Sequence, residues 1–242
     1  MKYKVLIIGS EGFLGKNLKL QKNKQIFKST RYFSNSKALY FDINFVNCYE
    51  IVKIFDVIII LSGNSSPKNS QNSKIAFNIN NKIIKLINYA KKYTHVIFFS
   101  SSSVFTGDNK KLFLTNTKLK PFNTYGLLKS RVEKSIKNFE NVTILRLPKL
   151  YLNKNSLKKN IKLFYKNFYF QPLNILDLAK VVDKIIEHKI TGIHNIGTKI
   201  ENYADFFNIK NKKLISNKKI KFPGLLKTSS TLAALFKKNK FI

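Results

Sequence analysis

The sequence predicts an α/β fold: a doubly wound, parallel, Rossmann-like sheet with a small, shortened C-terminal lobe. Three observations favour this class. Short apolar runs lack the polar alternation of half-exposed strands, which is typical of strands buried on both faces. Segments with apolar residues at three- and four-residue spacing, the pattern of helices, separate these runs. The first run, residues 3–8, passes directly into a turn that contains Gly9, Gly12 and Gly15.

The expected elements follow one another along the chain in the order of βαβ units. Pro121 and Asn123 suit the entry to the second long helix, and Asn174 is placed to cap the third. The expected long helices cover residues 73–93, 124–139 and 175–188. The expected strands cover residues 3–8, 25–30, 38–43, 56–63, 95–105, 142–147 and 192–197.

The regular alternation of strands and helices falters after residue 151. We therefore expect residues 1–151 and 172–199 to form the Rossmann core. Residues 152–171 and 200–242 are polar, aromatic and rich in lysine, which indicates a small substrate lobe and a lysine-rich tail. The apolar patch in the tail either docks on the core or contacts a membrane surface or a partner.

The formal net charge is +33, with only 12 acidic residues against 45 lysines and arginines. Such a field attracts phosphates or anionic membranes, but lysines spread over a solvated surface account for it as well. No signature of a nucleic-acid-binding module is present, so specific nucleic-acid binding is not expected. The single Cys48 excludes an intrachain disulfide, and no apolar run is long enough for a signal peptide or a membrane span. These features predict a cytoplasmic protein.

The glycine turn after the first strand is a candidate phosphate site. Gly9, Gly12 and Gly15 form a G-x-x-G-x-x-G pattern, in which backbone amides can approach a dinucleotide pyrophosphate closely. The alternative is a tight turn without a ligand. At the end of the second strand Arg31 stands where an acidic residue would read a ribose 2′-hydroxyl, so NADP is slightly favoured over NAD. Asp42 could accept a hydrogen bond from an adenine amino group, or simply end a strand.

Tyr125 and Lys129 stand four residues apart at the start of the second long helix. The spacing alone carries no information, because 11 tyrosines and 42 lysines (45 basic residues less three arginines) in 242 residues give about two such pairs by chance. The chain has one other, Tyr49 and Lys53, which we interpret as accidental. Only the sequence context distinguishes the two pairs.

That context resembles the extended short-chain dehydrogenase/reductase family of sugar-nucleotide epimerases, dehydratases and reductases. The resemblance runs from Tyr3 to about Gly197 and depends on several blocks in the family's order and spacing. They are IIGSEGFLG, FDI, NINNKIIKLINYAKK, HVIFFSSSSVF, PFNTYGLLKSRVEK, ILRLPKLY and LNILDLAKVV with GIHNIG.

The resemblance implies a catalytic trio of Ser101, Tyr125 and Lys129, with Ser100 or Ser102 as alternatives for the hydroxyl. Tyrosine would be the acid or base and lysine would hold the cofactor ribose. A nearby ammonium is expected to lower the tyrosine pKa from its usual value of about 10. The implied cofactor site comprises Gly9, Gly12, Phe13, Leu14, Gly15, Arg31, Asp42, Ile43, Leu61, Ser62, Gly63, Asn78, Lys129 and Pro148.

Residues that this chain lacks narrow the choice among the reactions of the family. Related 4,6-dehydratases carry an Asp-Glu pair where this chain has Ser102 and Ser103, and Cys48 lies in the wrong place for a fucose-type epimerase-reductase. The motif after the hydroxyl residue favours the dTDP-4-dehydrorhamnose reductase branch, in which a 4-keto nucleotide sugar is reduced. The alternatives are a 4-epimerase with tightly bound NAD and a non-catalytic dinucleotide-binding scaffold.

The remaining expectations concern partners and histidines. The resemblance implies a nucleotide-sugar substrate, and the short substrate lobe is compatible with a homodimer that helps close the site. Membrane-surface contact is not predicted. His95, His188 and His194 lack partners at a spacing typical of metal ligands or triads, so we interpret them as structural and expect no metal.

Overall fold

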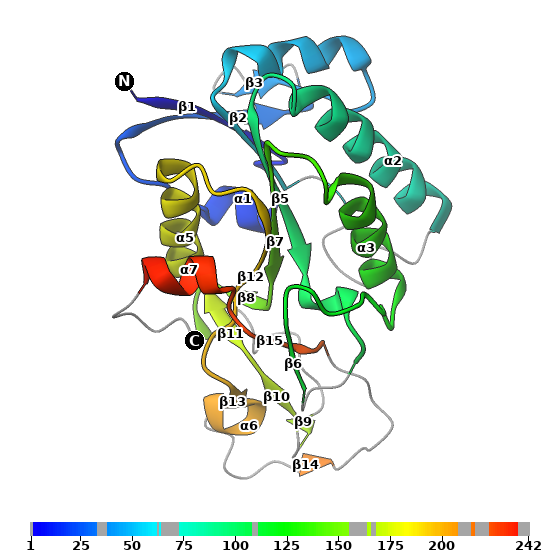
Figure 1. Cartoon of the computed structure of the whole chain (residues 1–242), viewed down its shortest axis with the longest axis vertical. Helices are drawn as coiled ribbons and strands as arrows, with labels where there is room; N and C mark the ends of the chain where they lie inside the picture. Colours follow the sequence, from blue (N-terminus) through cyan, green and yellow to red (C-terminus); the bar gives the residue numbers. More distant parts are fainter. Residues whose placement is uncertain are drawn as a thin grey trace.

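The described part of the chain consists of a sheet layer between two helical layers, with smaller elements below (Figure 1). The computed structural model describes residues 2–32, 38–61, 63, 73–107, 111–154, 164–165, 168–207, 214–215 and 223–236.

The central sheet has seven parallel strands in the order β12-β7-β5-β4-β1-β2-β3. The chain winds outward from β1 in one direction to β2 and β3, and in the other through β4 and β5 to β7 and β12. The predicted doubly wound parallel sheet is therefore confirmed. The strands are β1 (Tyr3–Ile8), β2 (Lys24–Thr30), β3 (Leu39–Tyr40), β4 (Val57–Ile60), β5 (His95–Ser101), β7 (Val142–Leu147) and β12 (Gly192–Asn195).

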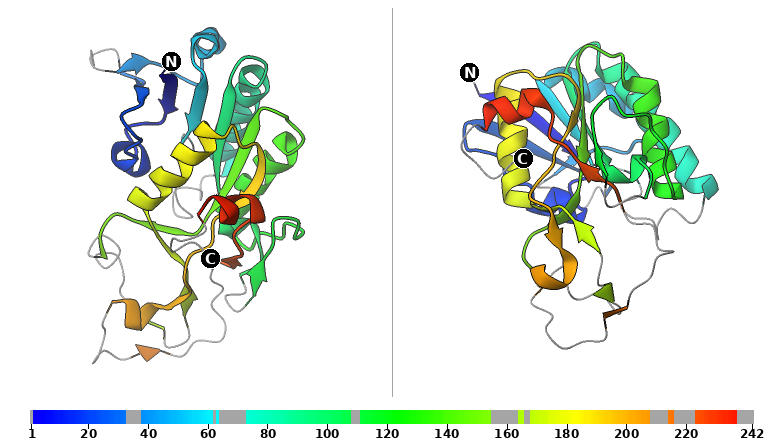
Figure 2. Two further views of the ribbon diagram at one scale, coloured as in Figure 1. Left: turned by 60° about the vertical axis from the view of Figure 1, so that its left-hand side comes forward. Right: turned by 60° about the horizontal axis from the view of Figure 1, so that its bottom comes forward.

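The helices cover both faces of this sheet (Figure 2). Val5 and Ile7 of β1 pack on the face covered by α1 (Phe13–Asn17) and α5 (Ile175–Glu187). Leu6 and Ile8 pack on the opposite face. That face is covered by the 3-10 helix η1 (Val46–Ile54), α2 (Ser73–Ala90) and α3 (Thr124–Ile136). Burial of both faces explains why the strands are apolar throughout.

The three long helices lie where the periodicity placed them, but two neighbouring segments differ from the expectation. The expected third strand is only the two residues Leu39–Tyr40. The following η1 was not predicted, although six of its nine residues are apolar. Its two buried residues, Tyr49 and Val52, are three apart, which matches the three-residue turn of a 3-10 helix.

Short strand pairs and helices complete the structure beside the carboxyl ends of the sheet strands (Figure 1). The described part of the tail, residues 223–236, packs on the core, since Leu232 is fully buried in the core cluster beside α5. The division into a core and a substrate lobe stays a prediction. The pairs are β8 (Lys149–Tyr151) with β11 (Pro172–Asn174), β10 (Tyr169–Phe170) with β13 (Glu201–Asn202), β9 (Phe164–Tyr165) with β14 (Leu214–Ile215), and β6 (Leu112–Phe113) with β15 (Leu225–Leu226). The short helices are η3 (Ser102–Val104), α6 (Tyr203–Phe206) and α7 (Ser230–Leu235).

None of the helices in the described part of the chain combines the length and the apolar character that crossing a membrane requires.

The first residue of β5, His95, makes the fold sensitive to acid. Desolvation lowers the pKa of its imidazole to about 4, while the ring contacts the Thr143 hydroxyl at 2.7 Å. Between pH 6.5 and 4 the unfolded chain takes up a proton that the folded chain does not, so stability falls as the pH falls through this window.

Between pH 7 and 4, we expect the free energy of unfolding to fall less for His95→Gln than for the wild type. The expected difference between the two decreases is on the order of 2 kcal/mol. Urea unfolding followed by circular dichroism measures this difference. His188→Gln, which changes an exposed histidine, is the matched control. Parallel pH curves for wild type and His95→Gln would contradict the prediction.

Candidate active site

Tyr125 and Lys129 lie in the first two turns of α3. Asn123 caps the helix, since its Oδ1 accepts a hydrogen bond of 2.7 Å from the Gly126 amide. Gly126 allows the first turn to lie against η3, because a Cβ there would come within 2.0 Å of the Ser103 carbonyl oxygen. The local sequence therefore brings Tyr125 directly against the segment that follows β5.

Ser101 ends β5, and its side chain opposes the larger effect of burial, which raises the pKa of the Tyr125 phenol. Its Oγ also accepts a 3.2 Å hydrogen bond from the Ser103 amide. Ser100 instead donates to Glu133 at 2.5 Å, and Ser102 is buried in η3. Of the serines considered for the hydroxyl, Ser101 is the one whose side chain influences the pKa of Tyr125, and its catalytic role remains a proposal.

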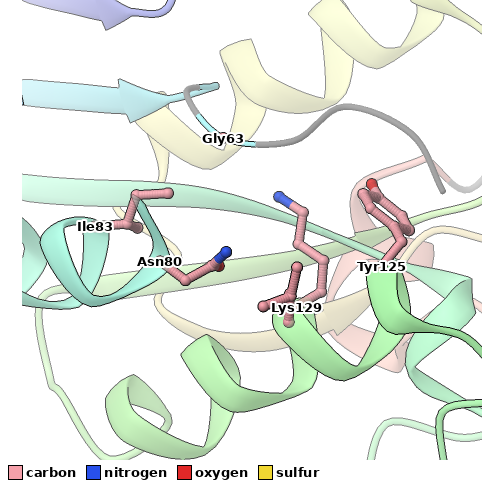
Figure 3. A pocket seen from close by; sticks show the side chains of 6 residues that line it. Gly63, Asn80, Ile83, Tyr125 and Lys129 are labelled. Atoms are coloured by element: carbon pink, nitrogen blue, oxygen red, sulfur yellow. The ribbon is translucent and has the colours of Figure 1, made fainter. Parts of the chain in front are cut away.

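Lys129 lies one helical turn beyond Tyr125 and faces the same space. Figure 3 shows both side chains rising from α3 in the same direction. The Lys129 Nζ donates to the Phe99 carbonyl oxygen at 2.8 Å and lies 6.0 Å from the centre of the Tyr125 ring. Desolvation lowers the pKa of Lys129 to about 8, against the opposing effect of the Glu133 carboxylate.

The pKa of Tyr125 differs from the expectation. Burial raises it above 10, and the hydrogen bond with Ser101 offsets only part of this increase. The expected lowering by the Lys129 ammonium is not the dominant effect, because Lys129 is itself desolvated and directed at the Phe99 carbonyl. The phenol is thus held in its protonated form at neutral pH.

Asn80 is a polar neighbour that sequence reasoning missed. It is buried in α2, donates from Nδ2 to the Ala76 carbonyl at 2.8 Å, and lines a small pocket with Tyr125 and Lys129 (Figure 3). The sequence had pointed to Asn78, which is exposed and lines the larger cleft. Asn78, Asn80 and Asn81 lie close together on α2, and the sequence pattern does not distinguish the buried one from the two exposed ones.

A cleft of about 1200 Å³ runs along the carboxyl ends of the strands, which is where open α/β sheets bind ligands. It is large for a single small-molecule site. Ser101, Tyr125 and Lys129, the expected catalytic trio, line it together with most of the expected cofactor residues. These are Gly9, Gly12, Phe13, Leu14, Gly15, Arg31, Ile43, Leu61, Gly63, Asn78, Lys129 and Pro148.

The glycine turn has a geometry that only glycine allows. Gly9 has a φ of +87°, and a Cβ on Gly15 would lie 2.4 Å from the Ser10 Cα. The turn is therefore close-packed and leaves bare backbone along the cleft wall. These residues fit the approach of a dinucleotide phosphate.

Two expected cofactor residues are not placed at the cleft. Asp42 is absent from the described residues that line it, and its Oδ1 accepts a 2.8 Å hydrogen bond from the Asn44 amide. An adenine contact for Asp42 remains a prediction. Ser62 lies outside the described residues.

A buried ion pair behind the site was also missed by sequence reasoning. Arg146 of β7 donates to both carboxylate oxygens of Glu133 at 2.8 to 3.2 Å. Its Nη1 also donates to the Thr115 carbonyl at 2.8 Å and to the Asn195 side chain at 3.4 Å. With the Ser100 hydroxyl on Glu133, this network joins α3, β5, β7 and β12 directly behind the catalytic trio.

The remaining sequence candidates have structural partners. Tyr49 is buried and donates to the Ile43 carbonyl, while Lys53 pairs with Glu50 at 2.6 Å. His194 contacts the Ser229 hydroxyl and the Thr191 carbonyl. No group of three or more potential metal-ligating side chains occurs within the residues that the structure describes.

Comparison with known proteins assigns the family. A model of the RmlD substrate binding domain matches residues 3–189, so the chain belongs to this family. The resemblance recognised in the sequence is thereby confirmed. No curated protein sequence matches the chain.

Solved structures share the fold at low sequence identity. A dTDP-4-dehydrorhamnose reductase from Bacillus anthracis in complex with NADP matches with a TM-score of 0.81 at 19% identity, over 100% of this chain and 94% of that one. A hypothetical dTDP-4-dehydrorhamnose reductase from Sulfolobus tokodaii gives 0.77 at 20%, over 97% and 94%. A UDP-N-acetylglucosamine 4-epimerase from Methanobrevibacter ruminantium gives 0.81 at 17%, over 100% and 94%.

We expect Glu133→Gln to lower the free energy of unfolding by about 3 kcal/mol, because it leaves the buried Arg146 charge without its counterion. Urea unfolding measures the loss. Glu140→Gln removes the same charge from an exposed position of the chain and serves as the control. The double variant Glu133→Leu/Arg146→Met should recover part of the loss, since no charge is then buried. Equal stabilities of the Glu133 and Glu140 variants would contradict this interpretation.

Proposed function

We infer that the protein is an NAD(P)-dependent nucleotide-sugar oxidoreductase, and that its reaction is the reduction of a 4-keto nucleotide sugar. The observation that carries this proposal is that Ser101, Tyr125 and Lys129 line one cleft together with the glycine turn. Membership of the RmlD substrate binding domain family supports it.

The cofactor assignment has independent support. Similar structures contain NADP in one case and NAD with UDP-glucuronic acid in another. In this chain the glycine turn would hold the pyrophosphate, Arg31 a 2′-phosphate and Lys129 the ribose. The nicotinamide dinucleotide, when bound, supplies the hydride that reduces the carbonyl carbon.

The protein's own residues handle the substrate oxygen. Tyr125 donates its phenolic proton to the carbonyl oxygen as that oxygen becomes an alkoxide. Ser101, which lines the same cleft, donates its hydroxyl proton to that oxygen in a hydrogen bond and stabilises the developing charge. Lys129 keeps a positive charge beside the phenolate that remains, until solvent returns the proton.

The pKa of Tyr125 favours reduction over epimerisation as the first step. A reductase begins with a protonated tyrosine, whereas an epimerase that first oxidises its substrate begins with a phenolate. Burial raises the pKa of Tyr125, so the phenol form predominates. Ser102 and Ser103, buried in η3, offer no carboxyl group for dehydration.

Removing the phenolic hydroxyl should separate chemistry from binding. We expect Tyr125→Phe to lower the turnover of a 4-keto nucleotide sugar, such as dTDP-4-dehydrorhamnose, by about 10²- to 10⁴-fold, and to leave the NADPH dissociation constant unchanged. NADPH consumption measures turnover, and Tyr93→Phe, which changes an exposed ring, is the control. Undiminished turnover in Tyr125→Phe would rule out this tyrosine as the proton donor.

The cofactor preference can be read from fluorescence titration with NADPH and NADH. We expect wild-type protein to bind NADPH more tightly, and Arg31→Ala to lose about tenfold in NADPH affinity with little change for NADH, because only NADPH carries the 2′-phosphate. Lys92→Ala, an exposed position beyond α2, controls for net charge. NAD that copurifies with the protein would favour the 4-epimerase, and binding of neither cofactor at micromolar concentration would end the proposal.

A further inference from the structure

Four cationic side chains line the cleft, and two of them are already engaged. Lys82 donates to the Asn44 Oδ1 at 2.5 Å and Lys129 to the Phe99 carbonyl at 2.8 Å. Arg31 and Lys149 have neither a hydrogen-bond nor an ion-pair partner for their charged groups in the described part of the protein. Arg31 has a place in the proposed cofactor site, whereas the mechanism leaves Lys149 without a role.

Lys149 is the first residue of β8, at the catalytic end of the cleft. It lies two residues beyond Leu147, which pairs with Ser101 across β7 and β5. Its strand is held in place by pairing with Pro172 of β11. Lys149 is exposed in the cleft, where partial desolvation lowers the pKa of its ammonium, and a bound anion would offset that effect.

The strand order separates Lys149 from the phosphates of a cofactor. The glycine turn follows β1, which is three strand positions from β7, or about 14 Å along the edge of the sheet. Arg31 follows β2, one position further, or about 19 Å away. Ser101, at the end of β5, lies between. An anion near Lys149 is therefore on the far side of the catalytic hydroxyls from the glycine turn.

We propose that Lys149 binds an anionic oxygen of the nucleotide-sugar substrate and so selects that substrate. The inference rests on the proposed function. Two parts of such a substrate carry this chemistry: the diphosphate that links nucleoside and sugar, and a carboxylate on the sugar itself.

The surroundings of Lys149 suit this role. Glu11 provides the one carboxylate within the described lining of the cleft, and it is bonded to Thr30 at 2.7 Å on the β2 side. The chain neighbours of Lys149, Pro148 and Leu150, are apolar and also line the cleft. An apolar wall with no competing carboxylate strengthens a charge-assisted hydrogen bond to a ligand.

The test compares UDP, UDP-glucose and UDP-glucuronate, which differ only in the sugar and its carboxylate. Their dissociation constants are measured by calorimetry with NADPH present, at about 0.15 M salt, where the general field of the protein is screened beyond about 8 Å. The variants are Lys149→Met, which removes the charge, and Lys149→Arg, which keeps it. Lys134→Met removes one charge from an exposed position on α3, outside the described lining of the cleft.

We expect Lys149→Met to weaken binding about tenfold, and Lys149→Arg and Lys134→Met to leave it within about twofold of the wild type. A loss confined to UDP-glucuronate identifies a sugar carboxylate as the bound group. An equal loss for all three ligands identifies the diphosphate. Unchanged affinities in Lys149→Met, or an equal loss in Lys134→Met, would overturn the assignment.

NADPH binding distinguishes this inference from the proposed function. Lys149→Met should bind NADPH as the wild type does, and weaker NADPH binding in this variant would mean that Lys149 serves the cofactor. A wild-type protein that binds NADPH but none of the three nucleotides would refute the role of Lys149 alone. Failure of the wild type to bind NADPH would refute the proposed function.

Discussion

The geometry of the candidate active site depends on the buried ion pair between Glu133 and Arg146. Burying two charges costs several kcal/mol per ion, and the cost is offset only when every donor and acceptor finds a partner. Here the carboxylate takes hydrogen bonds from the guanidinium and from Ser100, and the guanidinium reaches Thr115 and Asn195 as well. A shift of α3 against the sheet would leave a buried charge unpaired. The ion pair thereby fixes Tyr125 and Lys129, carried by α3, against Ser101, carried by β5.

The contrast between local and long-range contacts explains which features of the structure the sequence could predict. The strands, the long helices and the glycine turn depend on patterns of a few residues, and the structure places them close to the expected positions. The trio depends instead on a resemblance that spans most of the chain. The network around Arg146 joins residues 13, 31 and 49 positions apart, which no local pattern reveals. The pKa of Tyr125 was misjudged for the same reason: the i, i+4 spacing indicated a nearby ammonium, but not the burial of both groups.

Outside the central sheet, aromatic contacts take the place of a larger core. Phe170, Tyr203 and Phe207 are buried together, with ring centroids of Tyr203 at 4.9 Å from both phenylalanines. Aromatic side chains bury much apolar area per residue, so a few of them stabilise a small unit. Tyr203 also lines the cleft, and burial raises its pKa to about 12. One residue of this aromatic cluster therefore forms part of the cleft lining.

The net charge and the charges of the cleft act at different ranges. A formal charge of +33 attracts any polyanion, and salt screens that attraction beyond about 8 Å under physiological conditions. Selectivity for one anionic ligand requires cationic side chains that are held in place in the cleft and can bind that ligand directly. Lys82 and Lys129 each donate one hydrogen bond to a protein acceptor, and both contribute charge to the cleft. Arg31 and Lys149 lie at opposite ends of the strand edge, on either side of Ser101. Such a cleft favours a pair of anionic ligands whose reacting groups meet at the catalytic hydroxyls over one compact anion.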